Sequence, residues 1–286
     1  MYIALVSHTE NDRINSKGRC NLLLEKDQTF SHIRDFFEIM EDSKVPVTQS
    51  LMVGGKVGSR LVQNVNDSES IPKKSEKSIH IHCEKWSGSW KSLGPASNLE
   101  AAKCYEQYRK ILGRPTSCVF GHFLVNERLV GFLKSRKVKV DASYSPIAGE
   151  RFSIRQPFKW NGVVEVPAVS NMDYPLNPFI YGQHMHILKE MVRNLSDRKV
   201  LLHTYFHSYD FFRFSEKKTK RNTHTERLFS DFIDFASDMG CKFVLLKDVP
   251  KLKLERCESY SQIIVPKTTV FHHRLNKLIR IARDKF

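Results

Sequence analysis

The chain has 286 residues, of which 41% are hydrophobic and 27% charged, a composition typical of a globular protein with a substantial buried core. No apolar run approaches the roughly 18 residues of a membrane span. The six cysteines form no Cys-x-x-Cys pair, which favours a reducing, cytoplasmic compartment. A formal net charge of +15 suits attraction to a polyanion or an anionic surface, but we expect no nucleic acid as partner, because no zinc-finger spacing or RNA-recognition signature is present.

Short apolar runs alternate with amphipathic helical patterns in the first third of the chain. Extended segments are predicted at 2–7, 45–53 and 78–83, with a polar loop over 64–77. Apolar residues spaced i, i+3, i+4 and i+7 from Ile33 predict a helix between the first two segments. This alternation predicts β-α units around a largely parallel sheet.

The helix that begins after Ser97 is the best-marked element of the sequence. Ser97 and Glu100 match a capping box, and Gly113 marks the end of the helix. Strands at 118–120 and 138–140 are then predicted, with a helix capped by Asn126 between them.

Three further strands are predicted in the second half, at 163–166, 200–203 and 243–246. An amphipathic helix ended by Gly240 precedes the last of them, and residues 269–286 predict a basic C-terminal helix. About seven strands in one unbroken series favour a single deformed (β/α) barrel domain over residues 1–286, with its chemistry at the C-terminal ends of the strands.

Polar side chains follow three of these predicted strands. The first strand runs into His8, Glu10 and Asp12, and the third ends at His80 and His82. Residues i and i+2 of a strand share a face, so the two imidazoles of the third strand can converge on one centre. Together with a carboxylate they form a three-ligand site with an open position for a catalytic divalent metal. The alternative is a chance His-x-His pattern whose rings only hydrogen-bond a loop.

A late strand carries a further group of polar residues. The strand predicted at 200–203 runs into His203, His207 and Asp210. The order of these pieces over most of the chain resembles the polysaccharide deacetylases of the NodB-homology type. The segments that carry the resemblance are 76–82, 121–128, 140–146, 162–167, 202–210 and the closing helix and strand at 240–246.

The resemblance implies a metal-dependent hydrolase, with zinc as the expected ion, that removes an acetyl group from an N-acetylated saccharide or a related small amide. By position, it implies Glu10 or Asp12 as carboxylate ligand and His80 and His82 as imidazole ligands. His207 is then the acid that protonates the leaving amine.

Two departures from the family pattern affect the predicted chemistry. The residues after the first strand can be aligned with the family motif in two registers. In one register His8 takes the place of the usual acidic base, whereas in the other Glu10 is the base and Asp12 the ligand. The arginine usual in the third motif is missing, with Val119 near its place. A catalytically impaired barrel that binds an anionic glycan or partner through its basic surface is therefore the rival hypothesis.

Three residues near these motifs are predicted to bind the substrate. Trp86 lies on the loop after the histidine strand and could stack on a sugar, although packing on the barrel rim is an equal alternative. His122 follows a strand end and could line the site. Asp210 completes the predicted set.

Overall fold

The structure is a computed structural model that describes most of the chain. The described residues are 1–10, 29–53, 61–63, 65, 71–81, 96–144, 155–168, 170–171, 174–175, 185–214 and 219–255. The predicted helix at 269–286 lies outside them.

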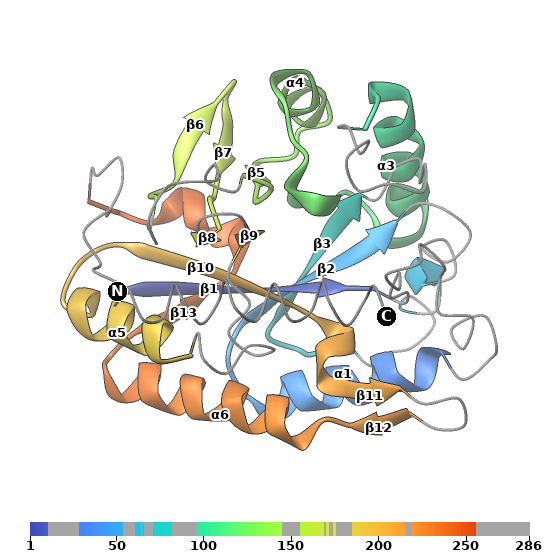
Figure 1. Cartoon of the computed structure of the whole chain (residues 1–286). Coiled ribbons are helices and arrows are strands. Elements are labelled where there is room, and N and C mark those ends of the chain that lie inside the picture. Colours follow the sequence, from blue (N-terminus) through green and yellow to red (C-terminus); the bar gives the residue numbers. More distant parts are fainter. Residues whose placement is uncertain are drawn as a thin grey trace, which may run out of the picture.

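A curled, nine-stranded sheet forms the centre of the molecule (Figure 1). Its order is β10 (Leu201–His207), β1 (Tyr2–Thr9), β2 (Val47–Val53), β3 (Ser75–Ile81), β4 (Ser117–Phe120), β5 (Val140–Asp141), β7 (Val163–Glu165) and β6 (Phe158–Trp160), with β13 (Lys242–Val244) paired to β1. Neighbouring strands are parallel except β6 and β7. The predicted deformed (β/α) barrel is confirmed.

The observed strands differ from the sequence prediction in their bounds and in their number. The predicted loop over 64–77 is wrong at its end, since β3 begins at Ser75. The strand β6 was not predicted at all. It pairs with β7 across Asn161 and Gly162, both at positive φ, as expected for a two-residue hairpin turn.

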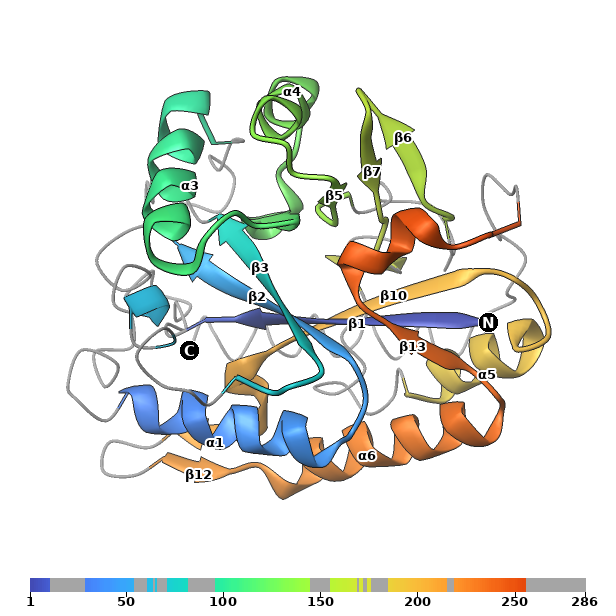
Figure 2. The same cartoon turned by 180° about the vertical axis from the view of Figure 1, so that it is seen from behind.

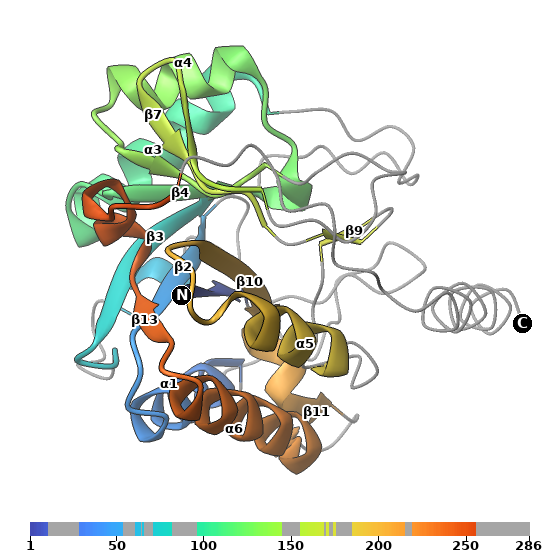
Figure 3. The same cartoon turned by 90° about the vertical axis from the view of Figure 1, so that its left-hand side faces the viewer.

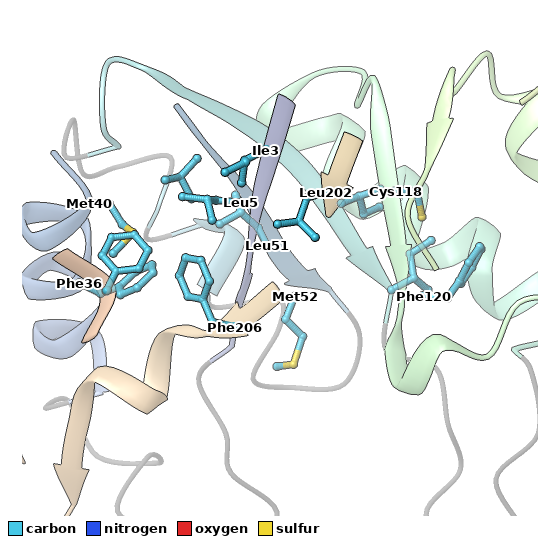
Figure 4. Close-up of a cluster of buried hydrophobic side chains, with 14 of the residues drawn as sticks. Ile3, Leu5, Phe36, Met40, Leu51, Met52, Cys118, Phe120, Leu202 and Phe206 are labelled. Carbon is cyan, nitrogen blue, oxygen red and sulfur yellow. The ribbon is translucent and has the colours of Figure 1, made fainter. Parts of the chain in front are cut away.

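Helices cover the sheet in two groups (Figures 1 and 2). α1 (Thr29–Asp42), α5 (Met185–Leu195) and α6 (Thr223–Asp238) lie on one side, and α3 (Asn98–Leu112) and α4 (Glu127–Ser135) on the other. The predicted capping box of Ser97 and Glu100 is present, and the Asn126 side chain accepts a hydrogen bond from the N–H of Leu129. In Figure 4, Phe36 and Met40 of α1 point toward Leu5 of β1, and all three are buried.

Short elements connect these layers. In the described part of the chain they are three 3-10 helices, η3 (Gly121–Phe123), η5 (Ser208–Phe211) and η6 (Leu246–Lys251), and two small hairpins, β11 (Phe212–Phe214) with β12 (Thr219–Arg221) and β8 (Ser170–Asn171) with β9 (Tyr174–Pro175).

The buried hydrophobic residues form two clusters, and the smaller cluster fills the interior of the curled sheet. It consists mainly of small aliphatic residues: Ala4, Val6, Val119, Val140, Ala142, Val166, Ala168, Leu201, Tyr205, Leu246 and Val249. Side chains of this size suit the narrow interior of a small barrel. Because side chains fill this interior, we expect a binding site at the ends of the strands.

Side chains, rather than backbone pairing, close the barrel. Within the described residues no ladder joins β10 to β6 or β7. The Gln156 side chain donates to the carbonyl of Leu201 (3.1 Å) and accepts from its N–H (2.8 Å). Nδ1 of His203 donates to the carbonyl of Val166 (3.0 Å). The barrel is deformed because this seam has two side-chain bridges where a regular barrel has a strand pair.

A pair of carboxyl groups is buried where β5 meets β7. Asp141 and Glu165 are register partners and are fully buried. Asp141 accepts from the hydroxyl of Ser143, and Glu165 accepts from the N–H of Tyr144 (2.8 Å). Burial raises the pKa of Asp141 to about 6, and burial beside Asp141 raises the pKa of Glu165 well above its ordinary value. The pair therefore keeps a proton near neutral pH.

Replacing Glu165 with glutamine is expected to make stability less dependent on pH. The unfolded chain releases the proton at ordinary carboxyl pKa values, so the wild-type contribution is complete at acid pH and is lost as the pH rises through the raised pKa values. The glutamine amide can donate to Asp141 without a titrating proton. Between pH 6 and pH 8, urea unfolding should show the variant gaining at least about 1 kcal/mol relative to wild type. A difference that stays constant over this range would contradict the shared proton.

Candidate functional site

The C-terminal ends of β1, β3 and β10 bring the predicted polar residues together. β1 and β10 pair in parallel with Val6 opposite Tyr205 and His8 opposite His207. Val6 and Tyr205 belong to the barrel interior, so the residues two positions later also point inward, at the mouth of the barrel. His80 is the last but one residue of β3, which is separated from β1 by β2, and its ring packs against that of His8.

Glu10 and His80 form the closest contact of this cluster. Nε2 of His80 lies 2.8 Å from Oε1 of Glu10, and Nδ1 lies 3.0 Å from the carbonyl oxygen of Val119. A carbonyl can only accept, so Nδ1 carries a proton, and in a neutral ring the Nε2 lone pair faces the carboxylate. Two acceptors at this distance need a cation between them, either a shared proton or a metal ion. The Nδ1–carbonyl bond is the orienting contact that metal-bound histidines usually make.

His8 lies against this pair in a fully enclosed position. Its ring centroid is 4.5 Å from that of His80 and 4.9 Å from that of Tyr205, on which it stacks. Burial, together with the neighbouring His80 and His207, holds the pKa of His8 well below its ordinary value. The ring is therefore neutral, and its buried Nε2 has no hydrogen-bond partner among the described residues.

These three residues have the geometry of a metal-ligand set. One ligand atom from each of His8, Glu10 and His80 lies within 4.8 Å of the others, and all three residues are buried. Two neutral imidazoles and a carboxylate are a donor set that zinc binds in catalytic sites. The orphaned Nε2 of His8 fits the same role, because an ion would satisfy it. The other predicted ligands, Asp12 and His82, lie outside the described residues.

His207 stands beside this set and is the member nearest to solvent. Its side chain is 20% exposed, and Nε2 lies 4.0 Å from Oε1 of Glu10. Asp210 accepts from the His207 backbone N–H (2.9 Å), and the same carboxylate oxygen is 3.6 Å from Nδ1. Tyr209 stacks on the ring at 4.7 Å. His207 is thus fixed from three sides with its Nε2 edge turned toward the cluster.

Several residues that the sequence analysis missed shape the site. Phe123 has a left-handed backbone (φ 57°) and packs 5.6 Å from His8 and 5.0 Å from Tyr205. Positive φ at a bulky residue is strained, and such strain clusters at functional sites. Ser208 donates to the carbonyl of Glu10 (3.0 Å) and accepts from its N–H (3.1 Å). Of these residues, Tyr205 could have been found from the sequence, because it alternates with His203 and His207 along the strand.

Other predicted residues lie apart from the cluster or outside the described part. His203 is four residues before His207, so its Cα is about 13 Å lower in the barrel. Burial lowers its pKa to about 4, and its role is at the seam. Trp86 lies outside the described residues, as does the side chain of His122. Asp210 contacts His207, and its predicted contact with substrate is untested.

Comparison with known proteins identifies the fold. No family model and no curated protein sequence matches the chain. Among solved structures, a Mycobacterium smegmatis protein described as a polysaccharide deacetylase superimposes with a TM-score of 0.53 at 12% identity, covering 89% of this chain and 93% of that one. The resemblance to polysaccharide deacetylases is thus confirmed at the level of the fold.

Two further structures share the fold and have other activities. The 4-alpha-glucanotransferase of Thermococcus litoralis has a TM-score of 0.50 at 11% identity, over 87% of this chain and 38% of that one. The alpha-amylase AmyC of Thermotoga maritima has a TM-score of 0.50 at 9% identity, over 98% and 80%. The fold alone therefore leaves the reaction open, and the side chains must decide it.

In the part of the chain that the structure describes, no helix has the length and hydrophobicity needed to cross a membrane. Cys104, Cys118 and Cys241 are free thiols.

Proposed function

We propose that the protein is a divergent polysaccharide deacetylase, a metal-dependent hydrolase that removes an acetyl group from an N-acetylated saccharide or a related small amide. The observation that carries the proposal is the contact between His80 and Glu10. The Val119 carbonyl fixes the His80 tautomer so that the Nε2 lone pair faces the carboxylate at 2.8 Å. Zinc is the proposed ion because of the two imidazoles and one carboxylate, and the cysteine content supports a cytoplasmic location.

The ligands in this proposal are His8, Glu10 and His80, with Asp12 and His82 as further candidates from the sequence. A divalent ion bound there supplies a Lewis acid that polarises the acetyl carbonyl and lowers the pKa of water. The protein contributes the preorganisation of the ligands. Ser208 holds the Glu10 backbone, and the Val119 carbonyl orients His80.

The proton transfers in this proposal fall to His207. His8 and Glu10 serve as ligands in this proposal. Among the described residues of the cluster, this leaves the imidazole of His207 to accept and donate the protons. It takes a proton from the attacking water and delivers it to the amine that leaves. Asp210 positions the ring, while Phe123 and Tyr205 keep water from the His8 side of the cluster.

Glycoside cleavage is the alternative that the fold permits. That reaction uses two carboxyl groups placed on either side of the scissile bond. In the described cluster three imidazoles surround one carboxylate, Glu10, and the next carboxylate, Asp210, is engaged by the backbone of His207. This composition favours metal-dependent hydrolysis over the two-carboxylate mechanism.

Metal analysis combined with product analysis tests the proposal. The purified full chain, stripped of metal and reloaded with zinc, is expected to hold about one ion per chain and to release acetate from N-acetylglucosamine oligomers only when loaded. Maltooligosaccharides serve as the control substrate and should remain intact. A chain that takes up no divalent ion and releases no acetate refutes the proposal, and cleavage of the glucan supports the glycosidase alternative.

Replacing His207 with alanine is expected to separate binding from chemistry. The variant should keep the metal, because His207 is not among the three ligands, and should release acetate roughly 100-fold to 10,000-fold more slowly, the usual cost of losing a general acid. His186, exposed on α5, provides the matched control, and its replacement by alanine should change neither quantity. Unchanged acetate release in the His207 variant would place the proton transfers elsewhere.

A further inference from the structure

The end of the barrel opposite the candidate site carries many exposed basic residues. Parallel strands begin at one edge of a sheet, and Figure 3 views the molecule from the side on which β1 begins. The basic end is defined here as the exposed basic residues just before these strands, at the start of β13, and on or just after η6: Lys44, Lys73, Lys74, Arg114, Lys137, Lys139, Arg198, Lys199, Lys242, Lys247, Lys251 and Lys253.

Few acidic residues offset this charge. Asp248 pairs with Lys251 and Glu255 with Arg198. Glu76 is buried below the surface. Glu106 pairs with Arg109 and with Arg136, which adjoins Lys137, and further acidic residues near this end are Glu41, Asp42, Asp197 and Asp238. The basic end therefore keeps an excess of positive charge.

Helix capping explains only part of the excess. The helices α1, α3, α4, α5 and α6 all end at this side, and cations near helix C-termini are favourable. Lys74 has this role for α1, because its Nζ donates to the carbonyl of Lys44 (3.0 Å) just after the helix, whereas Lys247 is the second residue of η6 and lies near the N-terminus of that helix. The placement of Lys247 therefore adds charge where no helix C-terminus requires it.

The kind of basic residue indicates the kind of partner. Ten of the twelve residues are lysines, which act as hydrated point charges, whereas recognition of individual phosphates in nucleic acids favours the bidentate guanidinium of arginine. Among the residues whose exposure the structure describes, no aromatic side chain is exposed for stacking on bases. The large hydrophobic side chain that is exposed there belongs to Leu99, at the start of α3. A dispersed set of lysines without apolar anchors fits the diffuse negative potential of a lipid surface.

We propose that the basic end docks reversibly on an anionic membrane surface, through attraction to headgroup phosphates. Each basic residue near such a surface strengthens binding about five-fold, and salt screens the attraction. Docking in this orientation turns the mouth of the barrel, with His8 and His80, away from the lipid. The inference is independent of the reaction at that site.

Sedimentation with lipid vesicles tests this proposal on the full chain. The protein is expected to bind vesicles of phosphatidylcholine with phosphatidylglycerol at low salt and to be released from them at high salt. It is expected not to bind vesicles of phosphatidylcholine alone. The test variant carries Lys73→Glu, Lys137→Glu, Lys139→Glu and Lys253→Glu. It should lose binding by at least about 100-fold.

A second variant with the same change in net charge is the control. It carries Lys103→Glu, Arg128→Glu, Lys220→Glu and Arg227→Glu, all exposed positions away from the basic end. It should lose far less binding, and circular dichroism confirms that both variants fold. Absence of binding to anionic vesicles, equal loss in both variants, or tighter binding of single-stranded RNA through the same lysines would each overturn the proposal.

Discussion

Replacing Glu10 with glutamine is expected to weaken zinc binding and to abolish acetate release. Glutamine keeps the shape of the side chain but removes the anionic oxygen that lies 2.8 Å from Nε2 of His80. Loss of a group that only orients a ligand costs roughly 10-fold to 100-fold in metal affinity, so loss of a ligand itself should cost more. Replacing His80 with alanine should have the same effect. Isothermal titration with zinc, after removal of bound metal, measures both.

The controls for this experiment come from the same chain. His186→Ala removes an exposed imidazole and should leave zinc affinity unchanged. His203→Gln removes a buried imidazole that lies at the barrel seam, and should lower stability without removing the metal. If Glu10→Gln binds zinc as tightly as the wild type, the ion, where present, is held by residues other than this cluster.

Replacing His8 with alanine distinguishes a metal ligand from a catalytic base at this position. If His8 were the catalytic base, His8→Ala would keep its zinc and lose activity. We expect instead that it loses both, because a ring nitrogen of the neutral, buried His8 lies within 4.8 Å of ligand atoms of Glu10 and His80, and its Nε2 has no hydrogen-bond partner among the described residues. Metal content of the purified variant distinguishes the two roles without any activity assay.

Local patterns predicted much of the fold. Apolar spacing located α1, and the capping residues Ser97 and Asn126 marked helix starts that the structure confirms. The turn at Asn161 and Gly162 was also within reach, since Asn-Gly between apolar residues is a strong hairpin signal. The seam formed by Gln156 was not, because a side chain that replaces a strand leaves no periodic pattern.

The candidate site was also predictable in part from local sequence patterns. Alternation along strands placed His80 and His207 at strand ends, and the parallel topology then brought them together with Glu10. The contact of His80 with the Val119 carbonyl could not be predicted, because a backbone acceptor has no sequence signature. The strained Phe123 is likewise set by packing against His8 and Tyr205 rather than by its neighbours in the chain.

Glu76 is a buried residue that was predicted to lie in a loop, and its loss should strongly destabilise the fold. Its Oε1 accepts from the hydroxyls of Thr116 (2.9 Å) and Ser117 (2.6 Å). Its Oε2 accepts from the hydroxyl of Thr48 (3.3 Å) and the N–H of Lys247 (2.8 Å). One carboxylate thus ties β2, β4 and η6 to β3 at the lower end of the barrel.

Glu76→Ala is expected to lower the free energy of unfolding by about 4 kcal/mol, because it leaves the buried hydroxyls of Thr48 and Ser117 and two partly buried donors without their acceptor. Glu76→Gln should cost about half as much, since its amide keeps one acceptor oxygen. Glu38→Ala, at an exposed position of α1, should change stability by less than about 0.5 kcal/mol. Urea unfolding monitored by circular dichroism measures all three. A loss below about 1 kcal/mol in the alanine variant would show that the network contributes little.

The two ends of β3 should respond independently to these substitutions. Glu76 and His80 lie on the same inward face of the strand, four residues apart, so one anchors the lower end of the barrel and the other faces the site at the mouth. Glu76→Ala, studied well below its unfolding temperature, should bind zinc within a few-fold of wild type, because the His80 contacts to Val119 and Glu10 do not depend on the lower network. Glu10→Gln should show the reverse, a large loss of zinc affinity with little loss of stability in the metal-free protein. Parallel changes in both variants would mean that the site and the barrel end form one cooperative unit.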